Sequence, residues 1–303
     1  NKGWEFNIDI AAVKTKDWSF NFGFNISQNK NEILELPENK NDELYTFGNK
    51  NYAYSVMMGD PLGSFYGYRY KGVYQNVEET YAVNTSGQRI LDIDGNPVVM
   101  KNGDQKVYPG DARYEDVNGD GVIDENDIVY LGNSNPTLTG GLNFTLRYKK
   151  VSLVAAFHGR AGQKVINQAR MDMENMRGKN NQSVAVLRRW RSEGDDTDIP
   201  RALYDKGYNY LGSDRFVEDA SFLRLKTVTL KYQMPAKWMK AIGVNKLELY
   251  ATGYDMFVWT KYKGQDPEVN LKAANDGTVA QVAIDSNNTP KPFKIAFGLN
   301  LNF

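Results

Sequence analysis

The sequence predicts an all-β fold that forms part of a large antiparallel transmembrane β-barrel with long extracellular loops. Three observations predict it. Large apolar residues alternate with small or polar ones in several segments, the connections alternate between short and long, and no run approaches the roughly 18 apolar residues that a membrane helix needs. Successive side chains of a strand point to opposite faces, so each segment has one apolar and one polar face. The lipid and lumen sides of a barrel differ in this way.

The clearest segment is 293–303. Every odd-numbered position carries a large apolar residue, and every even one carries Lys, Ala, Gly or Asn. Its last residue, Phe303, is aromatic, as the last residue of bacterial outer-membrane barrels commonly is. We therefore expect Phe303 to be a barrel-assembly signal at the periplasmic rim.

Other segments repeat the pattern less regularly, which gives about seven spanning strands, each near the ~10 residues that a tilted membrane strand needs. In the fifth of them the apolar phase shifts near Thr227, and a β-bulge would produce that shift. In chain order, the segments before the last are 4–10, 18–26, 142–148, 151–157, 222–232 and 247–259.

The connections alternate in length as barrel turns and loops do. Barrels have short periplasmic turns and long extracellular loops. The short or moderate connections are 13–18, 148–151 and 235–246, the last with one expected helical turn. The long ones are 29–137, 160–216 and 261–292. The strand-like stretch 64–75 is assigned to the first extracellular loop, because one extra crossing would place the next long loop on the periplasmic side.

Seven strands cannot close a barrel alone, because an open edge in lipid leaves backbone groups without hydrogen bonds. We therefore expect residues 1–303 to be the C-terminal portion of a barrel whose other strands come from upstream sequence or another chain. Asn1 falls in what reads as the middle of a domain.

Composition argues against several functional classes. Lys and Arg total 37, as do Asp and Glu, so no overall basic field indicates nucleic-acid binding. Cysteine is absent and His158 is the only histidine, which argues against a disulfide framework and a zinc site. No Gly-x-Ser-x-Gly elbow accompanies that histidine, and acidic residues in loops are common, so we expect no enzyme.

Residues 116–127 match a calcium-binding loop. Hard cations take oxygen ligands at positions 1, 3, 5, 7, 9 and 12 of such a loop, with glycine at the sixth position. Gly121 stands at that sixth position, and Asp replaces the usual Glu at the twelfth. We expect a structural Ca²⁺ that stiffens the first long loop; the alternative is a turn rich in Asp and Asn without metal. The expected ligands are Asp116, Asn118, Asp120, Val122 (through its carbonyl), Asp124 and Asp127.

Five aromatic residues lie in or near the long loops, and two interpretations remain open for them. Their rings can stack on a ligand or contact a lid, or they can form the interfacial belt of a membrane protein. They are Tyr204, Tyr208, Tyr210, Trp259 and Tyr262.

Several motifs occur together in a way that is typical of one family. They are Asp-Val-Asn-Gly-Asp-Gly at 116–121 with 136–141, Arg-Arg-Trp at 188–190 with Asp-Ile-Pro-Arg at 198–201, the run 215–226, and Trp-Thr-Lys-Tyr at 259–262 with Gly-Gln-Asp-Pro-Glu-Val at 264–269. On these residues, essentially the whole chain resembles the C-terminal barrel region of SusC/RagA-type TonB-dependent transporters of Bacteroidetes.

The resemblance implies a plugged barrel of about 22 strands. It also implies an outer-membrane importer of oligosaccharides or peptides that is energised by TonB and capped by a SusD-like surface lipoprotein. Its partners would be that lipoprotein, the TonB complex through upstream sequence, the rest of the barrel and plug, the lipid bilayer and the cargo. The N-terminal plug and the TonB-contacting segment are not in these 303 residues.

Three other functions remain as alternatives. A passive outer-membrane porin would need no plug, TonB or lipoprotein. A secreted, calcium-stiffened carbohydrate-binding module would be soluble without detergent. A surface hydrolase would depend on a specific carboxylate pair, and no motif here points to one.

Overall fold

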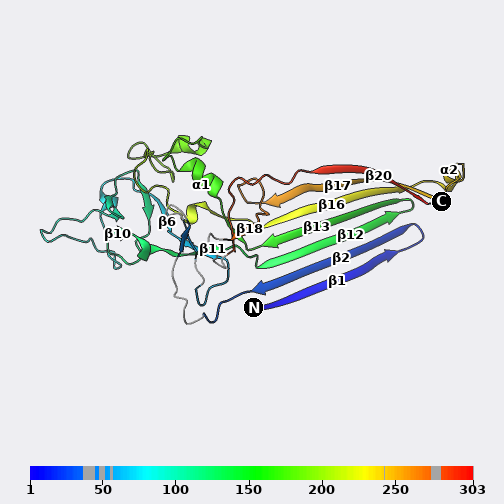
Figure 1. The fold of residues 1–303 in the computed structure, drawn as a ribbon, viewed down its shortest axis with the longest axis horizontal. Helices are drawn as coiled ribbons and strands as arrows, with labels where there is room; N and C mark the ends of the chain where they lie inside the picture. The colour runs from blue at the N-terminus through cyan, green and yellow to red at the C-terminus, as the bar shows by residue number, and fades with distance from the viewer. Residues whose placement is uncertain (37–44, 48–51, 55–56, 242, 274–280, 303) are drawn as a thin grey trace.

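One antiparallel sheet of seven long strands dominates the computed structural model, which describes residues 1–36, 45–47, 52–54, 57–241, 243–273 and 281–302 (Figure 1). All seven segments with alternating apolar residues are strands of this sheet. The spatial order is β1-β2-β12-β13-β16-β17-β20, so the order along the chain is kept. The strands are β1 (Lys2–Lys14), β2 (Trp18–Lys30), β12 (Leu138–Tyr148), β13 (Val151–Ala161), β16 (Phe222–Gln233), β17 (Lys246–Thr260) and β20 (Lys294–Asn302).

The register of the sheet places its large apolar side chains on one face. Leu249 of β17 pairs with Leu299 of β20, and Ala251 pairs with Phe297. Phe297 is 82% exposed, although it lies within a strand. The same pairing continues across the sheet, so the exposed apolar residues form one continuous surface, and polar residues such as Thr229 and Thr252 meet on the other face. The two-sided pattern that predicted a transmembrane barrel wall is therefore present.

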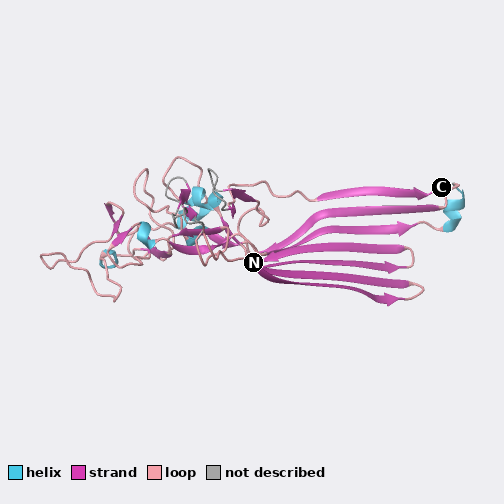
Figure 2. Cartoon of the chain, turned by 60° about the horizontal axis from the view of Figure 1, so that its bottom comes forward, coloured by secondary structure: helices cyan, strands magenta, loops and turns pink. Residues whose placement is uncertain are grey.

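Short and long connections leave opposite ends of the sheet (Figures 1 and 2). The short end carries two tight turns and helix α2 (Ala236–Ala241), which confirms the expected helical turn. The stretch 64–75 forms two short strands outside the seven-stranded sheet, β5 (Ser64–Gly67) and β6 (Tyr70–Val73), within the first long connection. None of the helices in the described ranges is long and apolar enough to cross a membrane.

The bulge predicted near Thr227 is present. Ala156 of β13 pairs with Thr227, and its neighbour Phe157 pairs with Leu225, so Lys226 is the additional residue in β16. The opposite strand also departs from a regular ladder here, since Asp255 has a φ of 49°. Both Lys226 and Asp255 are thereby displaced toward the polar side, where they form an ion pair with an N–O distance of 3.5 Å.

The three long connections, 31–137, 162–221 and 261–293, fold together into what we call the loop region. Its short strands form small sheets: β11 (Val129–Asn133) with β5, β4 (Tyr52–Tyr54) and β3 (Tyr45–Phe47); β10 (Val122–Ile123) with β7 (Lys101–Asn102) and β8 (Gln105–Lys106); β6 with β9 (Ala112–Tyr114); β14 (Lys164–Ile166) with β15 (Val217–Asp219); and β18 (Leu271–Ala273) with β19 (Gln281–Ala283). Its helices are α1 (Gln168–Glu174) and the 3₁₀ turns η1 (Glu78–Thr80), η2 (Glu125–Asp127), η3 (Val184–Arg188) and η4 (Asp214–Phe216).

One hydrophobic cluster joins all three connections. Phe65 comes from the first connection, Ile166 and Phe216 from the second, and Val282 from the third, and each is at most 1% exposed. Burial of large apolar side chains is the main favourable term in folding. The loop region is therefore a packed body rather than three separate loops.

Replacing Phe65 with alanine should open this body without removing the barrel wall. Truncating a fully buried Phe costs about 3–5 kcal/mol. Limited proteolysis should then cleave all three connections faster, while the seven strands stay protected. The matched control is Ile93→Ala, because Ile93 is fully exposed. Faster cleavage of the first connection alone would contradict the shared core.

Candidate functional site

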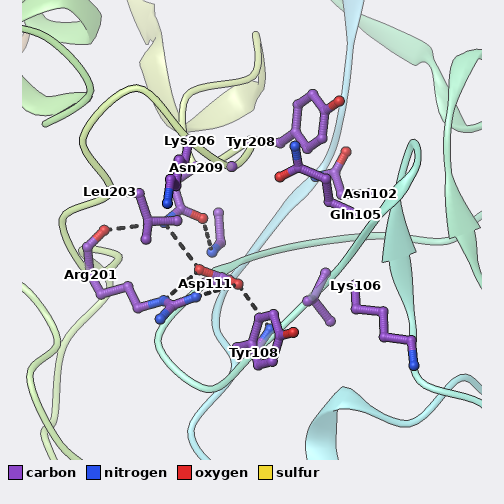
Figure 3. Close-up of a pocket in the computed structure, with 13 residues that line it drawn as sticks. Asn102, Gln105, Lys106, Tyr108, Asp111, Arg201, Leu203, Lys206, Tyr208 and Asn209 are labelled. Carbon is purple, nitrogen blue, oxygen red and sulfur yellow. Dashed lines mark hydrogen bonds and ion pairs between the residues drawn. The ribbon is translucent and has the colours of Figure 1, made fainter.

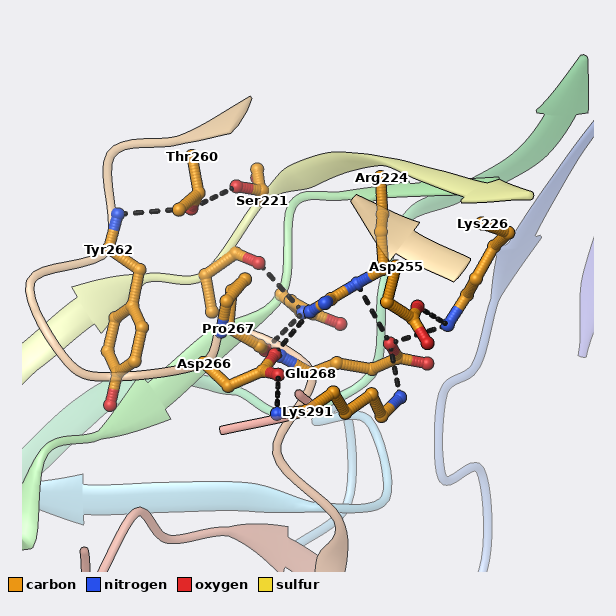
Figure 4. A network of polar contacts seen from close by, with 12 residues as sticks. Ser221, Arg224, Lys226, Asp255, Thr260, Tyr262, Asp266, Pro267, Glu268 and Lys291 are labelled. Carbon is orange, nitrogen blue, oxygen red and sulfur yellow. Dashed lines mark hydrogen bonds and ion pairs between the residues drawn. The ribbon is translucent and has the colours of Figure 1, made fainter. Parts of the chain in front are cut away.

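Two of the family-like motifs meet in a charged cluster where the loop region joins the sheet (Figure 4). Arg224 Nη2 lies 2.5 Å from Asp266 Oδ1, and Arg224 Nε lies 3.4 Å from Glu268 Oε2. Lys226 Nζ and Lys291 Nζ approach the same Glu268 oxygen at 3.1 and 2.5 Å. The side chain of Arg224 is only 3% exposed. This charge cluster therefore fastens the third long connection to the polar side of β16.

The charges of the cluster set the ionisation of its central acid. Burial alone would raise the pKa of Glu268, but hydrogen bonds from Lys291 and Lys226 outweigh burial and lower the pKa from 4.5 to about 2. Glu268 therefore stays ionised across the physiological range. A buried arginine without its acidic partner would be strongly unfavourable, so the ion pairs also exclude other placements of this connection.

A second buried cluster lies inside the second connection. Arg170 contacts both Glu174 and Glu218 through N–O distances of 2.9 and 3.1 Å, and Arg215 contacts Glu174 at 3.2 Å. The guanidinium of Arg215 also lies over the ring of Phe216, 4.9 Å from its centroid. The motif 215–226 thus supplies charges to both clusters, and it links helix α1 to the barrel wall.

A pocket of about 160 Å³ lies between the first and second connections (Figure 3). Arg201 and Asp111 form a bidentate pair in it, with N–O distances of 2.7 and 3.1 Å. Asn209 donates to the carbonyl of Arg201, and its own side-chain oxygen accepts the backbone N–H of Ala112. The remaining lining residues offer amide, amine and phenol groups, which suit a polar ligand; they include Asn102, Gln105, Lys106, Tyr108, Lys206 and Tyr208.

Three of the five sequence-predicted aromatic residues lie on or near this pocket. Tyr208 lines it, and its hydroxyl donates to Asp104 over 3.0 Å. The guanidinium of Arg177 lies over the ring of Tyr210, with its Cζ 4.5 Å from the ring centroid. Tyr204 is 62% exposed. Contact of Tyr204 or Tyr208 with a ligand stays a prediction.

The other two aromatic residues have different roles. Trp259 is on the apolar face at the loop end of β17, where it stacks on Phe157 at a centroid distance of 6.3 Å. That position is typical of an interfacial belt. Tyr262 is buried, and its hydroxyl donates to Asp285 over 2.6 Å. Its ring packs in a core, and contact of Tyr262 with a ligand or lid stays a prediction.

The residues of the calcium-type loop form a tight turn held by carboxylates. Asp116 accepts the backbone N–H groups of Gly119, Asp120 and Gly121, at 2.8, 3.3 and 2.8 Å. Asp127 is fully buried and accepts the N–H groups of Val117 and Asp124, at 2.7 and 2.9 Å. The acids at the first and last positions are therefore already oriented by the backbone.

The expected ligands do not converge on one point in this arrangement. Across the described residues, no three side chains from Asp, Glu, His and Cys are placed so that they could hold a metal ion. Asp120 uses one oxygen for the N–H of Val122 and the other for the amide of Asn118. Binding of Ca²⁺ by this turn would require Asp120 to exchange these hydrogen bonds for the ion, and such binding stays a prediction.

Sequence reasoning missed how the charged residues pair. Arg224, Asp266 and Glu268 were visible inside motifs, and their opposite charges were the available signal. The pair of Arg201 and Asp111 joins residues 90 apart in sequence, and no local pattern indicates it. Phe303, the expected barrel-assembly signal, lies outside the described residues.

Acid should release the third connection in a way that depends on Glu268. Because the folded-state pKa is lowered, the stabilisation by the Glu268 carboxylate is complete above about pH 4.5 and is lost as the pH falls toward about 2. Pepsin cleavage within 261–293 should accelerate over this window in the wild type. In Glu268→Gln it should already be faster at pH 5 and should change less with pH.

Glu193→Gln is the matched control, since Glu193 is exposed on the second connection. Its pH profile should follow that of the wild type. Identical profiles for Glu268→Gln and the wild type would show that the charge cluster does not hold this connection.

The whole chain is similar to known TonB-dependent receptors. It is 33% identical to TonB-dependent receptor P26 of Formosa agariphila, covering 100% of this chain and 29% of that protein. It is 27% identical to the TonB-dependent receptor SusC of Bacteroides thetaiotaomicron, covering 100% of this chain and 26% of that protein. No protein-family model matches.

The fold has a counterpart in a solved transporter. The RagAB peptide importer in its closed-closed state aligns with a TM-score of 0.70 and 23% identity, over 99% of this chain and 29% of that one. The chain thus spans less than a third of the proteins it matches. The antiparallel wall, the loop region at one end and the similarity over all of this chain point to the same family. The chain belongs to the SusC/RagA family of TonB-dependent receptors, in which it forms part of the C-terminal barrel region.

Proposed function

We propose that the protein containing this chain is an outer-membrane importer of oligosaccharides or peptides, energised by TonB and capped by a SusD-like lipoprotein. The observation that carries the proposal is the two-sided barrel wall with a packed loop region at one end, in a chain similar over its full length to TonB-dependent receptors. One similar receptor is SusC, and a solved structural neighbour is named a peptide importer.

The loop region gives this function a physical basis. Its pocket offers polar groups without a catalytic arrangement, as capture and release of a polar cargo require. In this assignment the short turns face the periplasm and the loop region faces the cell exterior. The charge cluster around Glu268 keeps the third connection on the lumen side of the wall, next to the path that cargo would take.

Affinity purification of the full-length protein from detergent-solubilised outer membranes tests the proposal. Mass spectrometry should find a plug on the same polypeptide and a co-purifying SusD-like lipoprotein. Uptake of labelled oligosaccharides or peptides by intact cells should stop when TonB is disrupted. Recovery of a barrel without plug or lipoprotein, with uptake that does not depend on TonB, would instead establish a passive porin.

The membrane placement predicts alternating reactivity along β20. Residues 1–303 contain no cysteine, so in a full-length background without other cysteines each single substitution reports on one position. In full-length protein in vesicles, a fluorophore at Phe297→Cys or Leu299→Cys should be quenched by nitroxide-labelled lipid. The same fluorophore at Asn300→Cys, on the polar face, should be quenched at least about threefold less. Equal quenching at all three positions would contradict the two-sided barrel wall.

We further propose that residues 116–127 bind a structural Ca²⁺. The supporting observation is charge: these twelve residues contain five carboxylates and no basic residue. Hard cations favour such oxygen-rich turns. The ion would tie the turn to η2, whose first residue follows Asp124.

Calcium should then protect this turn from protease. When free Ca²⁺ is ten times the dissociation constant, the open fraction should fall roughly tenfold. Asp120→Asn with Asp124→Asn should remove the calcium dependence of cleavage within 110–135. The control is Asp92→Asn, in a similar turn where Asp92 accepts the N–H groups of Asp94 and Asn96. Equal cleavage of the wild type in Ca²⁺ and in chelator would exclude a structural ion.

A further inference from the structure

The short-turn end of the sheet is strongly basic, although the chain as a whole is neutral. We call residues 14–18, 148–151 and 233–246 the short-turn rim. The rim contains one acid, Asp17, and seven basic residues, whereas basic and acidic residues balance at 37 each over the whole chain. The basic residues are Lys14, Lys16, Lys149, Lys150, Lys237, Lys240 and Lys246.

Backbone hydrogen bonds make the rim continuous. The N–H of Lys149 donates to the carbonyl of Asp17 over 2.7 Å, which joins the first turn to the second. The N–H of Gln233 donates to the carbonyl of Lys150 over 2.8 Å, which joins the second turn to the third. The turns that carry the lysines therefore lie together along one edge of the wall (Figure 1).

Most of these lysines have no acidic partner within the part of the chain that the structure describes. The ion pairs there include one rim lysine, Lys246, whose Nζ lies 4.0 Å from Glu248. Lys16, Lys149 and Lys237 are all exposed. Lys149 also adopts a φ of 51°, which glycine and asparagine adopt more readily.

Aromatic rings interleave with the lysines at the border of the apolar face. Trp18 and Tyr148 lie against each other with ring centroids 4.3 Å apart, and Lys149 Nζ lies 5.2 Å from the centroid of Tyr148. Trp238 of α2 is 59% exposed. Tryptophan and tyrosine prefer the level of lipid headgroups.

The length of the strands also places the rim at the level of the lipid headgroups. The 11 residues of β13, at the usual rise and barrel tilt, span roughly 25 Å along the membrane normal, the height of an apolar barrel band. One end of β13 is Val151, beside Lys149 and Lys150. Their ammonium groups therefore come within reach of headgroup phosphates.

We propose that the short-turn rim binds the phosphate groups of anionic phospholipids, such as phosphatidylglycerol, in the adjoining membrane leaflet. The proposal rests on the membrane placement in the proposed function. A lipid is favoured over a periplasmic protein because the basic edge continues directly into the exposed apolar face through an aromatic border. Juxtamembrane lysines attract anionic lipid in this way.

A fluorophore near the rim tests the proposal in the full-length protein. It would be attached at Ala236→Cys, an exposed residue of α2, in a background without other cysteines. The protein would be placed in phosphatidylcholine vesicles doped with nitroxide-labelled phosphatidylglycerol or, separately, nitroxide-labelled phosphatidylcholine. At low salt, labelled phosphatidylglycerol should quench at least about twofold more.

The triple variant Lys16→Gln, Lys149→Gln, Lys237→Gln should weaken this preference, because it removes three of the seven rim charges. Salt at about 1 M should abolish the preference by screening the remaining charges. A matched triple variant at the other end, Lys101→Gln, Lys179→Gln, Lys206→Gln, changes exposed lysines of the loop region and should keep the preference.

Equal quenching of the wild type by the two lipids, or a preference that the rim substitutions leave unchanged, would overturn the proposal. Quenching by both labelled lipids without preference leaves the membrane placement intact and refutes only the lipid-binding rim. Absence of quenching by either lipid, here and at Phe297→Cys, would refute the membrane placement itself.

Discussion

The structure depends on a ladder of backbone hydrogen bonds whose register keeps most large apolar side chains of the seven strands on one face. In lipid, an unpaired N–H or C=O group costs several kcal/mol, so only a continuous ladder is tolerated. A slip of one residue would exchange the two faces of a strand. Even the bulge at Lys226 obeys this constraint, because the extra residue restores the apolar phase at Val228 while its own charge meets Asp255 and Glu268 on the polar side.

The wall in turn determines where the loop region can fold. The three long connections follow β2, β13 and β17 and leave the sheet at the same end. Each connection has apolar residues that must be buried. They do so together, around Phe65, Phe216 and Val282. Charges then select the arrangement: the third connection can dock only where Arg224 and Lys226 meet acids, because a buried charge without a partner is costly.

Local periodicity explains what could be predicted from the sequence. Alternation in 293–303 and its counterparts identifies the strands, and the phase shift near Thr227 identifies the bulge, because both depend on neighbours within a few residues. The interior of the loop region could not be predicted in this way. Arg201 meets Asp111, and Tyr52 donates to the carbonyl of Ser213, across 90 and 161 residues. The burial of Tyr262 could not be predicted for the same reason, since its partner Asp285 follows 23 residues later. The calcium pattern in 116–127 stays a prediction.

The core shared by the three connections has a consequence for how such proteins diversify. A single connection cannot be exchanged between relatives without exposing residues that the other two connections bury, so the three connections are inherited as one unit. Recombination that moves one loop alone would give a poorly folded receptor, whereas a crossover within β1 or β2 would transfer a complete, self-consistent set. Natural chimaeras in this family should therefore have their junctions in the barrel strands that precede the first long connection.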